Sequence, residues 1–166
     1  MYYARIPRSM KEGALRLRPL KIWDSLFLRN SFQNKEMLSV NGLNKPIYSS
    51  PFLLWWWLKR AFIFSYTILF DSRRIGFIGV YHLKLGMAAQ ISLFICKKNM
   101  RRLGYGSRVF RLLAKNLRRY SIVEKIIVRV RADNHTAMAF WKKNGFVQLS
   151  TEGDVTTIVM SLKESP

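Results

Sequence analysis

The chain has 166 residues, a length typical of one domain with its own hydrophobic core. Its 29 Lys and Arg outnumber its 9 Asp and Glu, which gives a formal net charge of +20, and its 49% of hydrophobic residues are too many for a disordered protein. The single cysteine, Cys96, excludes an internal disulfide framework, and the chain has no CxxC pair or Cys/His cluster that offers a structural zinc site.

The first fifty residues predict a strand, a helix and a loop. Residues 1–13 are basic but lack the apolar run of a secretory signal, so we expect a cytoplasmic protein. Residues 15–20 alternate apolar and basic side chains, which is the pattern of a half-buried strand. Residues 23–32 predict a short helix, and residues 41–50, rich in Gly, Pro, Asn and Ser, predict a loop.

The most apolar stretch, residues 52–70, is long enough to suggest a membrane span. Lys59 and Arg60 near its middle argue against one, because each charge would cost ~2.5–3.5 kcal/mol on insertion scales. Ser50, followed by a proline, is typical of a helix N-cap with proline in the first turn. We therefore expect a helix that ends near the two charges, then a buried strand over residues 63–70, and no membrane span.

Further strands follow in the rest of the chain. The polar residues 71–74 predict a tight turn, so the strand before them forms a hairpin with residues 75–83. Residues 88–96 are more apolar and predict a central strand. The remaining strands are predicted at residues 124–131, 146–149 and 155–162.

Two helices lie between these later strands. One follows Gly104 and Gly106 and has one apolar face and one basic face. The other spans residues 134–144, with Gly145 as its C-terminal cap. Together the elements indicate a single α/β domain over residues 1–166, with a mixed sheet and helices on both faces.

The segment 101–107 lies between a buried strand and the basic helix. Its glycines let the backbone approach a ligand closely, and the unpaired N–H groups at the start of the helix favour an anion such as a pyrophosphate. A tight connection without a ligand is the other interpretation of a lone GxG pattern. The charge of +20 also favours an anionic partner, which includes nucleic acid, a membrane surface and a phosphate-bearing small molecule.

A second motif follows at residues 133–146, and together the two resemble the GNAT superfamily of acetyl-CoA-dependent N-acetyltransferases. The R/Q-x-x-G-x-G/A pattern of that family is matched by Arg101, Gly104 and Gly106. Its N-x-x-A-x-x-F-Y-x-K-x-G-F pattern is matched by Asn134, Ala137, Phe140, Lys143, Gly145 and Phe146. The resemblance covers roughly residues 14–163 and is sharp at 88–149. It implies a mixed, mostly antiparallel sheet of about seven strands with a parallel, splayed pair at the acetyl-CoA site.

The resemblance also implies the cofactor contacts. Backbone amides of residues 102–107 are expected to bind the pyrophosphate, the end of strand 88–96 to pair with the pantetheine arm, and Asn134 to bond to that arm. The basic stretch 97–119 offers cations to the ribose 3′-phosphate, and a solvated face is its alternative role. No metal is implied. The residues expected at acetyl-CoA are Phe94, Ile95, Cys96, Arg101, Arg102, Leu103, Gly104, Tyr105, Gly106, Ser107, Asn134 and Trp141.

The sequence departs from the family where acid–base chemistry is usual. Gln90 stands nearest the position of the usual glutamate base, and Trp141 replaces a tyrosine that serves as general acid. Tyr81 and His82 are the remaining catalytic candidates, since one of them is expected to face the cleft. Cys96 has no visible base partner and is expected to be a buried structural thiol. An amine that arrives neutral needs no protein base.

For the acceptor, Arg29, Trp56 and Gln90 are the candidate contacts, because their surroundings resemble GNAT members that acetylate nucleotide-linked amino sugars. These members are close to the ribosomal-protein acetyltransferases. We therefore expect direct transfer of acetyl to a small-molecule primary amine, anionic in character. Acetylation of a protein N-terminus or lysine is one alternative, and an inactive GNAT scaffold that binds nucleic acid is another, although no RRM, KH or zinc-finger signature is present. Both monomer and homodimer stay open.

Overall fold

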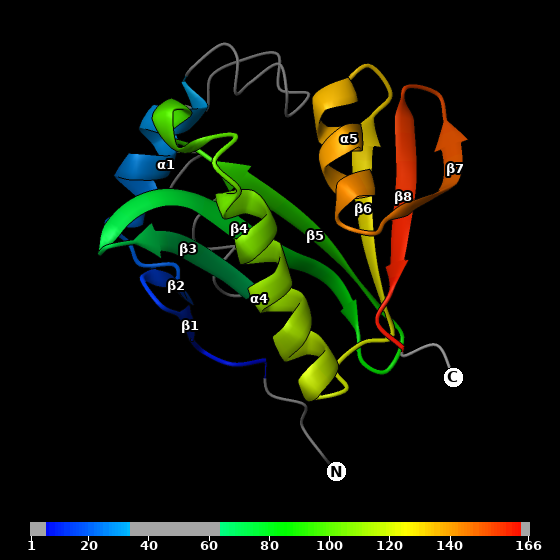
Figure 1. Ribbon diagram of the computed structural model, residues 1–166, viewed down its shortest axis with the longest axis horizontal. Coiled ribbons are helices and arrows are strands. Elements are labelled where there is room, and N and C mark those ends of the chain that lie inside the picture. Colours follow the sequence, from blue (N-terminus) through cyan, green and yellow to red (C-terminus); the bar gives the residue numbers. More distant parts are fainter. Residues whose placement is uncertain (1–5, 34–63, 164–166) are drawn as a thin grey trace.

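The computed structural model describes residues 6–33 and 64–163 (Figure 1). The loop predicted at residues 41–50, the helix predicted to end near Arg60, and Trp56 lie outside the described residues. The elements are β1 (Met10–Glu12), β2 (Leu15–Pro19), α1 (Asp24–Phe32), β3 (Phe64–Phe70), β4 (Arg73–Lys84), β5 (Ala88–Ile95), the short 3-10 helix η1 (Lys98–Met100), α4 (Tyr105–Arg119), β6 (Lys125–Arg131), α5 (His135–Lys143), β7 (Val147–Glu152) and β8 (Val155–Ser161).

The eight strands of the described residues form one sheet in the order β1-β2-β3-β4-β5-β6-β8-β7. Every neighbouring pair is antiparallel except β5 and β6, which run parallel. The mixed, mostly antiparallel sheet is therefore confirmed, with eight strands where about seven were expected. The additional strand is β1, which pairs with β2 around Gly13 at a φ of 58°. Its three residues are too few to show a periodic pattern.

Helices cover both faces of the sheet, as predicted. Side chains alternate between the faces along a strand, so Leu17 and Ile68 enter the core cluster that α4 completes. Their neighbours Arg18 and Thr67 point to the other face, where both bond to the carboxylate of Asp24 on α1. We call this second side the α1 face. It lies opposite the side that carries α4.

The amphipathic pattern of α4 has the expected result. Its buried residues are Val109, Phe110, Leu112, Leu113, Ala114 and Leu117. Phe110 also joins an aromatic cluster with Trp141 of α5 and with Phe146, at ring-centroid distances of 5.5 Å and 5.3 Å. This cluster fixes α5 against α4 on the same side of the sheet (Figure 1). The strand and helix signals after residue 104 are all confirmed.

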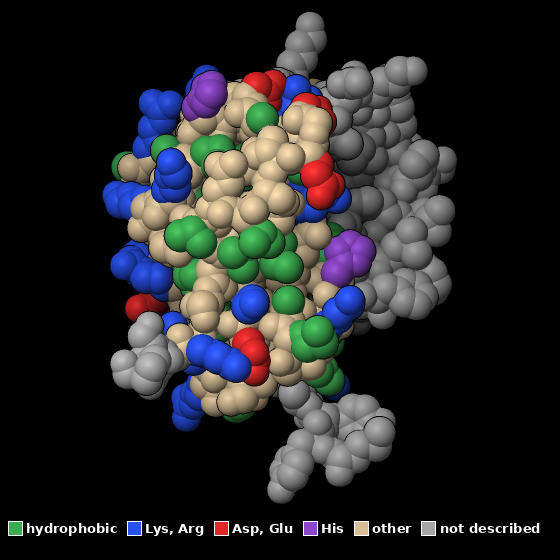
Figure 2. Space-filling view, turned by 90° about the vertical axis from the view of Figure 1, so that its right-hand side faces the viewer, with side chains coloured by type: hydrophobic (Ala, Val, Ile, Leu, Met, Phe, Trp, Pro, Cys, Tyr) green, Lys and Arg blue, Asp and Glu red, His purple; other side chains and the backbone are tan. Residues whose placement is uncertain are grey.

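The far edge of the sheet ends at β7. Val147 and Leu149 of this strand are both 64% exposed. Figure 2 shows hydrophobic side chains across the centre of this face, with cationic side chains gathered along one edge. Among the described residues, no helix is long and apolar enough to cross a membrane.

Candidate active site

A V-shaped notch opens between β5 and β6. The two strands pair only from Ala88 to Gln90, opposite Lys125 to Ile127, whereas the other edge of β6 pairs with β8 along its whole length, Lys125 to Arg131. The predicted splayed pair is therefore confirmed (Figure 1). Among the described strands, none pairs with the β6 side of residues 91–94, so the backbone groups on that side are available to an extended ligand.

The turn before α4 presents a run of backbone amides. Arg102 and Gly104 have φ values of 60° and 80°, which curl the chain into a left-handed bend. Within the described residues, no amide of residues 102–107 donates to a backbone carbonyl; the first to do so is that of Arg108, which bonds to the Gly104 carbonyl at 3.1 Å. These N–H groups and the positive end of the α4 dipole therefore suit a pyrophosphate.

Space for a ligand is present beside the same turn. A Cβ added at Gly104 would meet no atom within 4 Å. The Nε of Arg101 donates to the Ile95 carbonyl at 2.9 Å, which ties the turn to the end of β5. The residues predicted at the pyrophosphate thus lie next to the residues predicted at the pantetheine arm. The amides and the open space fit acetyl-CoA, which supplies an activated acetyl thioester when bound.

The start of α4 is held close to α5. A Cβ at Gly106 would lie 3.1 Å from the Phe140 ring, so this glycine permits the close approach of the two helices. Asn144 donates from Nδ2 to the Ser107 hydroxyl at 3.1 Å. These contacts fix the first turn of α4, and they leave the backbone amides of the turn free to face a ligand.

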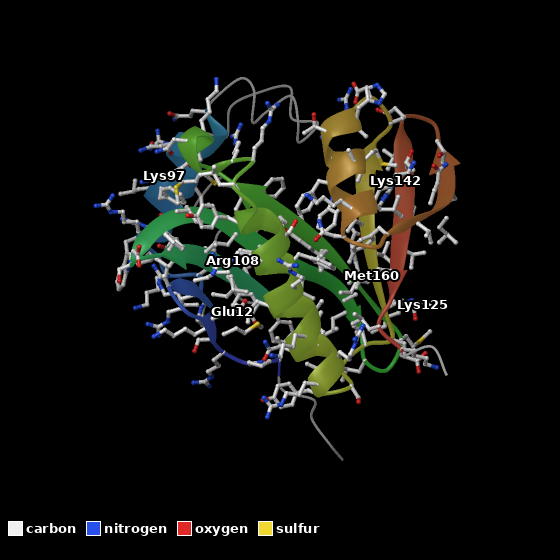
Figure 3. All side chains as sticks on the ribbon, viewed as in Figure 1. Glu12, Lys97, Arg108, Lys125, Lys142 and Met160 are labelled. Atoms are coloured by element: carbon white, nitrogen blue, oxygen red, sulfur yellow. The ribbon has the colours of Figure 1, made fainter. Side chains whose placement is uncertain are left out.

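Cations surround this region on several elements. Figure 3 labels Lys97 before the turn, Arg108 on α4 and Lys142 on α5. A pocket of about 640 Å³ also runs beside α4 toward Asn144. Its cationic lining is Arg111, Lys115, Arg118 and Arg119. The pocket offers room and charge for the predicted contact with the ribose 3′-phosphate.

Two residues expected at the cofactor have structural roles. The side chain of Asn134 caps α5, because its Oδ1 accepts from the Ala137 amide at 3.0 Å. Trp141 is 5% exposed and packs edge-on against Phe110 and Phe140. The aromatic residue at position 141 of the motif therefore packs in the core. A contact of Asn134 or Trp141 with the cofactor stays a prediction.

Tyr105 likewise packs within the protein. Its ring lies edge-on to Phe70 with the centroids 4.7 Å apart, which joins the turn to β3. Its side chain therefore helps to hold the amide-bearing turn, and a contact of Tyr105 with the cofactor stays a prediction.

Three polar side chains, those of Tyr81, Gln90 and Ser92, form a group on the α1 face at the apex of the notch, which is the point where β5 and β6 separate. Tyr81 and Gln90 are cross-strand partners on β4 and β5. Ser92, which sequence reasoning did not single out, lies opposite Gly79, and its hydroxyl donates to the Tyr81 hydroxyl at 2.9 Å. The Tyr81 ring lies over Gly79, where an added Cβ would be 2.8 Å from ring atoms. Alternation with Val80, a core residue, sets this group on the face opposite α4.

The protonation of Tyr81 follows from its surroundings. Burial raises the pKa of its hydroxyl above the ordinary value of 10.0, and the hydrogen bond from Ser92 offsets only part of that shift. Tyr81 therefore keeps its proton at neutral pH and is able to act as an acid or a donor, not as a base. His82 is exposed, with a φ of 45°, at an irregularity of β4 that breaks the pairing after Tyr81.

No carboxylate comes from the two strands, β4 and β5, that carry the polar side chains at the apex. Neither β4 nor β5 contains Asp or Glu. Among the described residues, no group of three or more His, Cys, Asp and Glu side chains is placed to hold a metal ion. Cys96 is a thiol at neutral pH, because burial raises its pKa to about 11 despite a hydrogen bond with Ser31 and the charge of Arg101.

Arg29 is the one acceptor candidate on α1. Its Nε is buried and has no hydrogen-bond partner among the described residues. A buried guanidinium N–H without a partner is costly, and an anionic ligand is the natural acceptor for it. Within the part of the chain that the structure describes, the Arg29 Nε thus keeps a hydrogen-bond donor that no contact uses.

Comparison with known protein families identifies the family of this chain. The sequence profile of the acetyltransferase (GNAT) family matches residues 29–146, which is most of the chain. No curated protein sequence matches the chain.

Solved structures share the fold. The chain is similar to spermidine N-acetyltransferase from Vibrio cholerae, with CoA and spermine (TM-score 0.77, 17% identity, covering 91% of this chain and 97% of that one). It is similar to RimL, the ribosomal L7/L12 alpha-N-protein acetyltransferase, with coenzyme A (0.77, 16%, 94% and 97%). It is also similar to the aminoglycoside acetyltransferase AAC(6')-Ib with ribostamycin and coenzyme A (0.77, 16%, 90% and 94%). At these identities the likeness is one of fold.

Proposed function

The chain belongs to the acetyltransferase (GNAT) family and is an acetyl-CoA-dependent N-acetyltransferase, and we propose that its acceptor is the primary amine of a small anionic molecule such as a nucleotide-linked amino sugar. One observation carries the proposed reaction. The amide-bearing turn of α4 and the Tyr81, Ser92 and Gln90 group lie on opposite faces of the sheet, and the notch between β5 and β6 joins them. A donor and an acceptor are thus able to meet there from opposite sides.

The proposed step is direct attack. The neutral amine attacks the acetyl carbonyl, a C–N bond forms as the C–S bond breaks, the leaving sulfur gains a proton, and the nitrogen loses one to solvent. Tyr81 supports this step because it is protonated and lies at the apex. Its hydroxyl supplies a proton or a hydrogen bond to the leaving sulfur. Gln90 orients the amine through hydrogen bonds, since its amide takes no proton.

The charge of the chain supports an anionic acceptor. Spermidine and ribostamycin, named with the similar structures, are polycations, and a protein with a net charge of +20 repels them. A phosphate-bearing acceptor is instead attracted. Arg29, whose Nε has no hydrogen-bond partner among the described residues, is the proposed anion contact, and Trp56 remains a proposed contact outside those residues.

A screen of acceptors tests this proposal. CoA release would be followed with acetyl-CoA and four acceptor classes, namely nucleotide-linked amino sugars, free amino sugars, spermidine and peptides with free N-termini. The proposal expects the highest kcat/KM with the nucleotide-linked amino sugars and a loss of that preference in Arg29→Gln. Turnover of peptides alone would replace it with protein N-terminal acetylation. Turnover of spermidine alone would show that charge does not select the acceptor.

A further inference from the structure

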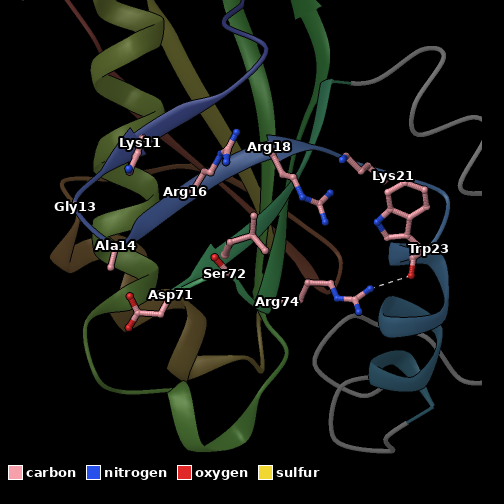
Figure 4. Close-up of a pocket in the computed structure, with 11 residues that line it drawn as sticks. Lys11, Gly13, Ala14, Arg16, Arg18, Lys21, Trp23, Asp71, Ser72 and Arg74 are labelled. Carbon is pink, nitrogen blue, oxygen red and sulfur yellow. Dashed lines mark hydrogen bonds between the residues drawn. The ribbon is translucent and has the colours of Figure 1, made fainter.

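An open pocket of about 620 Å³ lies away from the notch, between the β1–β2 hairpin, the β3–β4 turn and the start of α1 (Figure 4). One carboxylate, that of Asp71, belongs to its lining, together with the indole of Trp23. Cations outnumber it among the described lining residues. They are Lys11, Arg16, Arg18, Lys21 and Arg74.

Two of these cations share one buried carboxylate. Arg18 bonds to both oxygens of Asp24, at 2.6 Å and 2.8 Å, and a nitrogen of Arg74 lies 3.6 Å from the same group. Arg74 also donates to the Trp23 carbonyl at 3.0 Å, as Figure 4 shows. Among the described residues, two guanidinium groups thus share one buried carboxylate, which leaves a net positive charge that is held in place. A ligand therefore meets ordered donors rather than flexible surface side chains.

Two more cations face each other across the hairpin. Lys11 and Arg16 are direct cross-strand partners of β1 and β2. Like charges in that position destabilise an antiparallel pair. Among the described residues, neither forms an ion pair that would relieve the repulsion. An anion bound between them would relieve it, so the repulsion is understandable as part of a binding site.

Trp23 adds a flat apolar surface to this charge. It is 57% exposed, and the Nζ of Lys21 lies 5.1 Å from its ring centroid. A large exposed indole beside phosphate-binding cations matches a ligand that joins a planar base to a phosphate. The pocket volume also falls in the range of small-molecule sites. A concave site of this size favours a discrete ligand over a flat membrane surface.

The pocket is separate from the acetyl-transfer notch. It lies on the α1 face, because Arg16 and Arg18 alternate with the core residues Leu15 and Leu17. The amide-bearing turn belongs to the opposite face. Along β4, Tyr81 lies seven positions after Arg74, which is about 23 Å at the rise of a strand. We propose that this pocket is a second ligand site that binds a nucleotide, with its phosphates among Lys11, Arg16 and Arg74 and its base against Trp23.

Titration calorimetry with UDP tests the site. The full chain would be saturated with acetyl-CoA, so that the cofactor turn is occupied, and UDP would be added to the wild type and to single variants. Arg16→Gln and Lys11→Gln should each weaken UDP binding about tenfold or more, and Trp23→Ala about fivefold or more. Arg129→Gln removes the same charge from an exposed position on β6 and should change the affinity less than about twofold.

Thermal unfolding of the free protein gives a second readout. Lys11→Gln and Arg16→Gln remove the cross-strand repulsion, so each should raise the unfolding midpoint while weakening UDP. This pair of effects separates loss of a site from loss of the fold.

Several results would overturn the proposal. UDP affinity in Arg16→Gln and Lys11→Gln equal to that in Arg129→Gln would place UDP elsewhere, and absence of UDP binding to the wild type would remove the site. Pyrophosphate that binds as tightly as UDP would show an anion site without a base contact. A hexaglutamate peptide that binds in an Arg16-dependent manner while UDP does not would assign the pocket to an acidic protein segment. The dependence of UDP affinity on Lys11 and Arg16, rather than UDP binding as such, reports this pocket, and it does so whether or not acetyl transfer occurs at the notch.

Discussion

The Ser92 hydroxyl donates a hydrogen bond of 2.9 Å to the Tyr81 hydroxyl, which holds a protonated phenol beside Gln90 at the point where β5 and β6 separate. The arrangement depends on Gly79, because any side chain there would collide with the Tyr81 ring. The phenol thus lies on the acceptor side of the notch. In the proposed mechanism it takes the place of the family's usual acid, which Trp141 does not supply.

Removal of the Tyr81 hydroxyl should impair the chemical step. Tyr81→Phe keeps the ring over Gly79 and should lower kcat about 100-fold, because general acids contribute at least that much. The KM for acetyl-CoA should stay unchanged. Ser92→Ala leaves the phenol but not its hydrogen bond, so a loss of about fivefold is expected. Steady-state kinetics on both variants measure these effects, and a Tyr81→Phe enzyme with wild-type kcat would remove Tyr81 from the mechanism.

The pH dependence of kcat/KM should follow the ionisation of the acceptor amine rather than that of a protein side chain. Since neither β4 nor β5 carries a carboxylate, kcat/KM should rise about tenfold per pH unit until the acceptor amine is neutral. With two acceptors whose amines differ in pKa, the inflection should move with the amine.

Gln90→Glu is the matched test of this interpretation. It places a base at the apex and should raise kcat/KM about tenfold below the inflection of the wild type. An inflection that is the same for both acceptors in the wild type would instead reveal a protein base.

Cys96 should be dispensable for transfer. Its raised pKa of about 11 keeps the thiol protonated at neutral pH, so it is a poor nucleophile. Cys96→Ala should retain kcat within about threefold, and alkylation of the wild type by iodoacetamide at pH 7 should be slow. A trapped acetyl-cysteine in mass spectrometry of the intact enzyme would contradict direct attack.

The carboxylate of Asp24 should make the free energy of unfolding depend on pH in the acidic range. Burial alone would raise its pKa, but hydrogen bonds from Arg18, Thr67 and the Lys21 amide prevail, so the pKa lies below its ordinary value of 3.8. A carboxyl whose pKa is lower in the folded state stabilises above its unfolded pKa, and this contribution is lost as the pH falls through the folded pKa. Asp24→Asn leaves Arg18 without its counter-charge and should cost about 3–5 kcal/mol at pH 7.

Urea unfolding across pH measures this effect. The difference between wild type and Asp24→Asn should be constant from about pH 5 to 8 and should shrink below about pH 4. A difference that persists unchanged at pH 3 would show that the carboxylate charge is not what stabilises the fold.

Local patterns were enough to predict most of the fold. The alternation of apolar and basic residues in β2 and the two-faced periodicity of α4 both follow from burial of one side of the element. The polar residues before β4 mark a turn instead. The two glycine-containing motifs indicated the splayed pair through their resemblance to a family. In β1, by contrast, only Met10 is buried, which leaves no period to detect.

The site was less visible in the sequence because its contacts depend on register. Ser92 reaches Tyr81 only because Ser92 lies opposite Gly79. The sequence of one strand does not determine which residue of the neighbouring strand lies opposite. The place of Trp141 in a motif predicted a contact with acetyl-CoA, whereas in the structure three aromatic neighbours pack around its ring. The pocket beside Trp23 joins residues of β1, β2, β3 and β4 and of the turns next to them, so no single sequence motif marks it.

The most direct test of the account is calorimetric titration of acetyl-CoA. Gly104→Glu places a carboxylate in the open space beside the unpaired amides of the α4 turn, whereas Gly153→Glu makes the same change at a positive-φ glycine with open space in the β7–β8 turn. We predict 1:1 binding for the wild type and Gly153→Glu, and no binding for Gly104→Glu. Absence of binding to the wild type, or unchanged binding to Gly104→Glu, would contradict an acetyl-CoA site at the start of α4.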